Sequence, residues 1–121
     1  MSLQTGGSSK LTLVNLFVGI WLIISPFVLI YTNIAPAVWN NVGIGILLIL
    51  LVTYVLFSTI TFEWAGWIMA ALGVWEIISP FVLGFWSYPT IMWNNIIAGI
   101  IIWVVGAWFA RASWQQARPS R

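Results

Sequence analysis

A stretch of eleven residues recurs 54 positions further along this chain, and this recurrence limits the possible folds more than any other feature. Residues 19–29 read GIWLIISPFVL, and residues 73–83 read GVWEIISPFVL. A second motif, WNN, follows at 39–41 and again at 93–95, with the same offset of 54. Because the offset is constant, the connection between the two motifs has the same length in both copies. We therefore expect one structural unit that occurs twice in tandem.

The hydrophobic residues form long runs that are almost free of charge. They make up 62% of the 121 residues, whereas charged residues make up 5%. The run 11–62 contains no charged residue and has room for two membrane crossings of about 20 residues each. The run 65–110 has room for two more, and Glu76 is its only charged residue. The sequence therefore predicts an all-α membrane protein with four transmembrane helices, arranged as two tandem parallel helical-hairpin repeats.

The two repeats set the expected boundaries. We predict a flexible tail over 1–10, a first repeat over 11–58, an inner loop over 59–64, a second repeat over 65–111 and a basic tail over 112–121. The helices are expected over about 11–30, 37–58, 64–85 and 90–111. An even number of crossings places both termini on one side, which carries Lys10 and the three arginines. The positive-inside rule then predicts a multi-pass protein of the cell (inner) membrane with both termini in the cytoplasm.

Each copy places a Ser-Pro pair near the outer end of its first helix. Pro26 has no backbone N–H, so the carbonyl of Leu22 loses its helical hydrogen bond and needs another donor. We expect the Ser25 hydroxyl to bond to the carbonyl of Trp21 and the helix to bend there. The second copy repeats the pair at 79–80. Both a static kink that shapes the packing and a moving hinge are compatible with this pattern.

Glu76 is the one ionisable residue expected deep in the bilayer, and Leu22 is its counterpart in the first repeat. A charged side chain at that depth costs about 2.5–3.5 kcal/mol on insertion scales, so we expect it to be neutral, paired or directed at a polar cavity. In a functional interpretation, the carboxyl handles protons or cations or anchors a polar ligand. In a structural one, it is a protonated group bonded to a neighbouring helix, for instance to backbone groups disturbed at Pro80.

The WNN motifs place amide side chains near the start of the second helix of each repeat. Asn40 and Asn94 could line a polar cavity close to the outer surface. Alternatively, they cap the helix start and form hydrogen bonds between helices, which contribute about 0.6 kcal/mol each in membranes. The sequence leaves both interpretations open.

Ten tryptophans make the chain tryptophan-rich, and we expect them at two depths. Trp21 and Trp75 are repeat equivalents that should lie deep in the membrane, as should Trp103. Their rings either pack in the core or stack on a bound carotenoid, quinone or lipid tail. Seven others are expected at the membrane interfaces: Trp39, Trp86 and Trp93 at the outer one, and Trp64, Trp67, Trp108 and Trp114 at the inner one.

The residues that most enzymes use for chemistry are missing. The sequence has no cysteine and no histidine, which removes thiol chemistry and the commonest general base and metal ligand. We therefore expect neither an enzyme nor a metal site. The basic residues are four in number and lie toward the chain ends, a pattern typical of membrane topology. We expect no binding to nucleic acid.

The repeat resembles the SPW repeat family of small prokaryotic integral membrane proteins, named for a Ser-Pro-Trp motif. The resemblance covers about 12–111, and the motif stands here as Ser25, Pro26 and Phe27 and as Ser79, Pro80 and Phe81, with Phe in the third position. It implies an integral membrane protein with two helices per repeat. It implies no particular biochemical activity.

We therefore expect a structural or accessory subunit that packs with itself or with a larger membrane complex, in contact with the lipid bilayer. Strips of small residues would mediate this packing, including Gly43 and Gly45 on the second helix and Gly66, Ala70 and Gly73 on the third. The alternative is a small carrier, channel or lipophilic-ligand-binding protein with a site at the repeat interface around Glu76.

Overall fold

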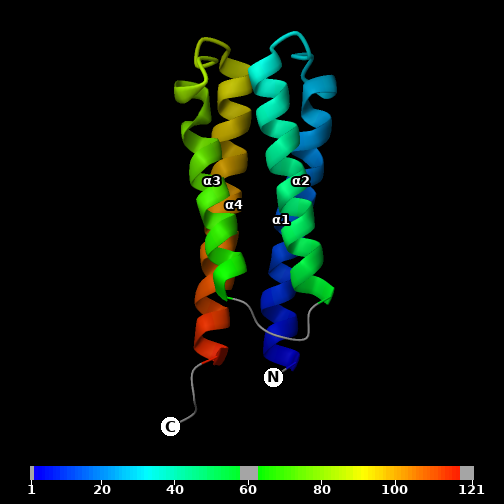
Figure 1. The fold of residues 1–121 in the computed structure, drawn as a ribbon, viewed down its shortest axis with the longest axis vertical. Helices are drawn as coiled ribbons and strands as arrows, with labels where there is room; N and C mark the ends of the chain where they lie inside the picture. Colours follow the sequence, from blue (N-terminus) through cyan, green and yellow to red (C-terminus); the bar gives the residue numbers. More distant parts are fainter. Residues whose placement is uncertain (1, 58–62, 118–121) are drawn as a thin grey trace.

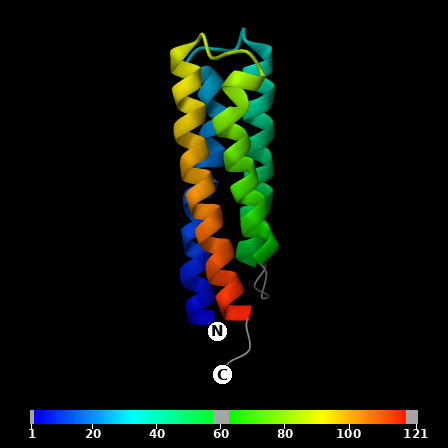
Figure 2. The same cartoon turned by 90° about the vertical axis from the view of Figure 1, so that its left-hand side faces the viewer.

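The computed structural model describes residues 2–57 and 63–117, and these residues form four α-helices. The helices are α1 (Ser2–Val28), α2 (Ala35–Phe57), α3 (Glu63–Val82) and α4 (Pro89–Ala117). They pack side by side as two hairpins, α1/α2 and α3/α4, with both described ends of the chain at one end of the bundle (Figures 1 and 2). We call the opposite end, which carries the turns 29–34 and 83–88, the loop end.

Each helix contains a segment long and apolar enough to cross a membrane: Lys10–Val28, Ala35–Phe57, Trp64–Val82 and Pro89–Ala112. These spans have 19 to 24 residues, which matches the thickness of the hydrocarbon layer. The predicted fold class is therefore confirmed. The chain is a membrane protein built from two tandem helical hairpins.

The helix ends differ from the expected ones in two places. The helical backbone of α1 starts at Ser2, although 2–10 were expected as a tail, and that of α4 continues through Ala117. Extending an existing helix adds one hydrogen bond for each residue fixed, so polar residues can prolong an apolar span. The expected inner loop lies mostly in 58–62, and two of the arginines lie in 118–121, both outside the described residues.

Glycines hold the two helices of each hairpin in close contact. A Cβ atom added to Gly45 on α2 would lie 2.5 Å from the backbone oxygen of Gly19 on α1. The equivalent pair in the second hairpin is equally tight, because a Cβ on Gly99 would lie 2.6 Å from the oxygen of Gly73. Small residues thus let the backbones approach within each hairpin. Gly43 takes no part in this contact, since nothing lies within 4 Å of a Cβ placed there.

The loop end contains a small apolar cluster that combines equivalent positions of both repeats. Tyr31 and Phe85 are separated by the repeat offset, as are Ala37 and Ile91, and all four are buried. The repeats are not fully symmetric in their packing, however, because α1 packs against α4 more extensively than α2 packs against α3.

The turn after α1 is a left-handed cap. Ile30 has a φ angle of 58°, and the N–H of Tyr31 donates a 2.9 Å hydrogen bond to the carbonyl of Pro26. This bond is the signature of a Schellman motif, which satisfies a carbonyl at the helix end. Its equivalent position, Gly84, has a φ angle of 85°. The second repeat therefore has glycine where the first forces a β-branched residue into the left-handed region.

Candidate functional site

In each Ser-Pro pair, the serine hydroxyl bonds to the backbone carbonyl that the proline leaves without a donor. Pro26 cannot donate to the carbonyl of Leu22, and the hydroxyl of Ser25 takes its place with a 3.1 Å hydrogen bond. In the second repeat the hydroxyl of Ser79 donates to the carbonyl of Glu76 over 2.8 Å. The expected acceptor, the carbonyl of Trp21, was therefore wrong by one residue. The proline removes one donor, and the preceding serine supplies another.

Two asparagines meet between the repeats. Asn41 donates a 2.8 Å hydrogen bond to the side-chain oxygen of Asn95, and the two residues are repeat equivalents that are both fully buried. Asn41 also donates to the hydroxyl of Tyr31 over 2.6 Å, and Asn95 donates to the hydroxyl of Ser79 over 3.0 Å. A contact between equivalent residues places them next to the pseudo-two-fold axis. These bonds connect α2 to α4 and both to the Ser-Pro segments.

Two indole groups cross from one repeat to the other. Trp21 on α1 donates a 2.7 Å hydrogen bond to the side-chain oxygen of Asn94 on α4, and Trp75 on α3 donates a 2.7 Å bond to the oxygen of Asn40 on α2. All four residues are candidates predicted from the sequence, and the fold pairs them across the repeat interface. The capping role is wrong for Asn40 and Asn94, because α2 and α4 begin several residues earlier, at Ala35 and Pro89.

Glu76 is fully buried on α3, next to α2. Its Oε1 atom accepts a 2.7 Å hydrogen bond from the amide of Asn40, and its Oε2 atom has no hydrogen-bond partner in the described part of the chain. The carboxyl does not repair the backbone at Pro80, since Ser79 bonds to that carbonyl. Glu76 therefore adds one polar contact that Leu22 cannot make in the first repeat.

The remaining candidate residues differ in how much of their surface is exposed. Phe27 and Phe81, the third residues of the two motifs, are exposed at the loop end, as are Trp39, Trp86 and Trp93. Trp103, which was expected deep in the membrane, lies within the span Pro89–Ala112, and 45% of its surface is exposed. Trp21 and Trp75 are half-buried. The polar candidates thus gather between the repeats, and most aromatic candidates face outward.

A family comparison agrees with this arrangement. The model of the SPW repeat domain matches residues 10–109, which is most of the chain. The chain belongs to the SPW repeat family. A search of curated proteins gave no significant match to this SPW repeat protein, and neither did a search of solved structures.

Sequence reasoning missed three members of the polar cluster in this SPW repeat protein. Asn41 and Asn95 follow the asparagines that were chosen as candidates, and the sequence does not reveal which of two neighbouring amides faces the axis. Tyr31 was assigned to a loop, although its buried hydroxyl bonds to both Ser25 and Asn41. Its one sequence signal is that Phe85, its repeat equivalent, lacks the hydroxyl.

Proposed function

We propose that this SPW repeat protein is a structural or accessory subunit of the cell membrane, which packs with copies of itself or with a larger membrane complex. Both termini lie in the cytoplasm in this proposal, because Lys10 and Arg111 lie toward the end of the bundle opposite the loop end. The loop end then faces the outside. The chain has no enzymatic role in this proposal.

The proposal rests on the hydrogen-bond partners of the polar side chains. In the described residues, the serines and asparagines of the two motifs form hydrogen bonds with other residues of the same chain, and so do Trp21 and Trp75. The bonds of Trp21, Trp75 and Asn41 hold the two hairpins together, and the outer surface carries large apolar side chains. Such a rigid module suits a role in packing beside other membrane proteins.

The strip of small residues on α3 is used within the chain, because Gly66 faces Ala110 on α4 and Ala70 faces Gly106 on α4. A partner would therefore contact the open position at Gly43 or the larger exposed residues. Ile46 on α2, which is 47% exposed, is one such position, whereas Leu48 two residues later is fully buried.

Cysteine cross-linking in native membranes tests this proposal, because the chain has no cysteine of its own. Single variants such as Ile46→Cys and Ile100→Cys would carry a short photoreactive group on each lipid-facing side, and Leu48→Cys would be the buried control. We expect a discrete adduct, either with another copy or with one defined protein, from at least one exposed position. Adducts with lipid alone at every exposed position, together with a monomer in native-lipid nanodiscs, would contradict the proposal.

A second candidate function is a small carrier or ligand site around Glu76. One observation favours it: a carboxyl oxygen that has no partner among the described residues is buried between membrane-spanning helices, at a position where the other repeat has leucine. Such an intramembrane residue is a functional candidate by default. The hydrogen bonds from Asn40 through Asn41 to Tyr31 connect it to the loop end.

The variants Glu76→Leu and Glu76→Gln distinguish a carrier function of Glu76 from a purely structural role. Glu76→Leu copies the first repeat, and Glu76→Gln keeps the shape and one acceptor oxygen. If Glu76 handles protons or cations, both variants should abolish flux in proteoliposomes loaded with a pH-sensitive dye. Wild-type liposomes with no flux above that of empty liposomes would remove this candidate.

A further inference from the structure

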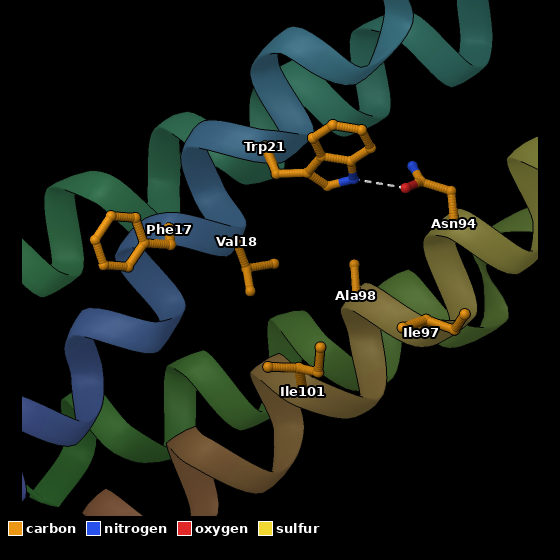
Figure 3. A pocket seen from close by; sticks show the side chains of 7 residues that line it. All are labelled: Phe17, Val18, Trp21, Asn94, Ile97, Ala98 and Ile101. Atoms are coloured by element: carbon orange, nitrogen blue, oxygen red, sulfur yellow. Dashed lines mark hydrogen bonds between the residues drawn. The ribbon is translucent and has the colours of Figure 1, made fainter. Parts of the chain in front are cut away.

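An apolar groove runs along the outside of the bundle between α1 and α4. Its volume is about 350 Å³, and it is lined by Phe17, Val18, Trp21, Asn94, Ile97, Ala98 and Ile101 (Figure 3). The groove exists partly because Ala98 forms its floor, where the first repeat has the larger Ile44 at the equivalent position. Phe17 and Ile97 are 68% and 55% exposed, so the groove opens to the outside of the bundle.

The position of the groove determines what it meets in a membrane. All of its lining residues lie within the spans Lys10–Val28 and Pro89–Ala112. Asn94 and Ile101 are separated along α4 by about 10 Å at 1.5 Å per residue, which is most of one leaflet of the hydrocarbon layer. The groove therefore lies in the leaflet at the loop end and runs along the direction of the lipid chains.

The polar groups of the groove are directed at each other and not at a ligand. Trp21 donates its indole N–H to the side-chain oxygen of Asn94, which closes one end of the groove (Figure 3). The amide nitrogen of Asn94 points away from the groove in the same view. This nitrogen has no hydrogen-bond partner in the described residues, but it is buried and so is not accessible from the groove. The accessible lining therefore disfavours a quinone ring or another polar head group. An aliphatic chain needs none.

We propose that this groove binds one acyl chain of a membrane phospholipid from the leaflet at the loop end. The chain lies against Val18, Ala98 and Ile101, with its upper part against the indole ring of Trp21. Dispersion contacts along a narrow groove would hold it longer than the lipids on the flat surfaces of the bundle. The phospholipid is the expected occupant because it is the most concentrated aliphatic molecule in the bilayer. This site does not depend on the accessory role proposed above, since a single chain forms it.

Native mass spectrometry of the full chain released from nanodiscs of defined phospholipid tests the proposal. We expect wild type to retain one phospholipid after the annular lipids have been removed. Ile97→Trp places a large ring at the rim of the groove and should lower the lipid-bound fraction about tenfold. Ile100→Trp is the matched control, because Ile100 is also exposed on α4 but does not line the groove. It should retain the lipid as wild type does.

Ala98→Leu, which fills the floor, provides a second variant if Ile97→Trp fails to fold, and it should also lose the lipid. Equal retention in the groove variants and in Ile100→Trp would overturn the proposal, as would a wild type without lipid. A quinone or carotenoid that co-purifies from native membranes in place of the phospholipid would overturn the choice of occupant. So would an adduct of Ile97→Cys with another protein.

Discussion

The side-chain nitrogen of Asn41 lies 2.8 Å from the side-chain oxygen of Asn95, its own counterpart in the second repeat. Each of these residues also bonds to a hydroxyl of its own hairpin, that of Tyr31 or that of Ser79. The pair therefore connects two hairpins that the chain joins only through 58–62. In a membrane such polar contacts supply the specificity that apolar surfaces lack.

Asn41→Leu should destabilise the protein more than Asn94→Leu. Asn41 takes part in three side-chain hydrogen bonds, with Asn40, Tyr31 and Asn95, whereas Asn94 has one, from Trp21. We expect a loss of about 1–2 kcal/mol for Asn41→Leu and about 0.6 kcal/mol for Asn94→Leu. Unfolding by SDS in mixed micelles, followed by circular dichroism, measures both values. Equal losses would contradict a central role for Asn41.

Gly45→Ala should destabilise the first hairpin, whereas Gly43→Ala should not. The new Cβ at Gly45 meets the backbone oxygen of Gly19 at 2.5 Å, and the one at Gly43 meets nothing within 4 Å. Alanine also favours the helix by about 1 kcal/mol over glycine, so Gly43→Ala should be neutral or stabilising. The two variants share one helix and one chemical change. If both shift the SDS midpoint in the same direction, the hairpin contact does not control stability.

Ile30→Gly should stabilise the turn after α1, and Gly84→Ile should destabilise the turn after α3. Both positions have positive φ angles, and a left-handed conformation costs a residue with a Cβ about 1–2 kcal/mol. Nothing lies within 4 Å of a Cβ added at Gly84, so the effect there comes from the backbone alone. Thermal unfolding in detergent should show opposite shifts. Shifts of the same sign would show that side-chain contacts outweigh the backbone strain.

Ser25→Ala should cost more stability while Pro26 is present than in its absence. The serine hydroxyl replaces the donor that proline removes from the carbonyl of Leu22. In a Pro26→Ala background, the new N–H can bond to that carbonyl, so the loss of the hydroxyl should matter less. A double-mutant cycle should give a coupling of about 0.5–1.5 kcal/mol. No coupling would mean that the hydroxyl acts through Tyr31 instead.

Stability should fall above about pH 10 because of Tyr31. Burial raises the pKa of its phenol above the usual 10.0, although hydrogen bonds with Ser25 and Asn41 oppose the shift. The unfolded chain then loses the phenol proton at a lower pH than the folded chain does. The stabilising contribution is therefore complete below pH 10.0 and is lost as the pH rises through the folded pKa. Tyr31→Phe should show a smaller fall between pH 9 and pH 11.5 in SDS unfolding, and an identical fall would exclude Tyr31 as its source.

The duplication, the four membrane-spanning helices and the placement of both turns at one end of the bundle could all be predicted from the sequence. These features depend on hydrophobic run lengths and on a constant offset, which are properties of the linear chain. The sequence also identified Glu76, Trp21, Trp75, Asn40 and Asn94 as unusual residues for a membrane interior. It could not pair them.

The packing of the helices shows that Trp21 bonds to Asn94 and that Trp75 and Glu76 bond to Asn40. It also shows that Gly45, and not Gly43, contacts the neighbouring helix of the hairpin. Helices that are apolar all round carry little information about which face turns inward. Their rotation is fixed by packing and hydrogen bonds between residues far apart in sequence. For the same reason Asn41 and Asn95 became the central pair, and the neighbouring amides bond to tryptophans at the side.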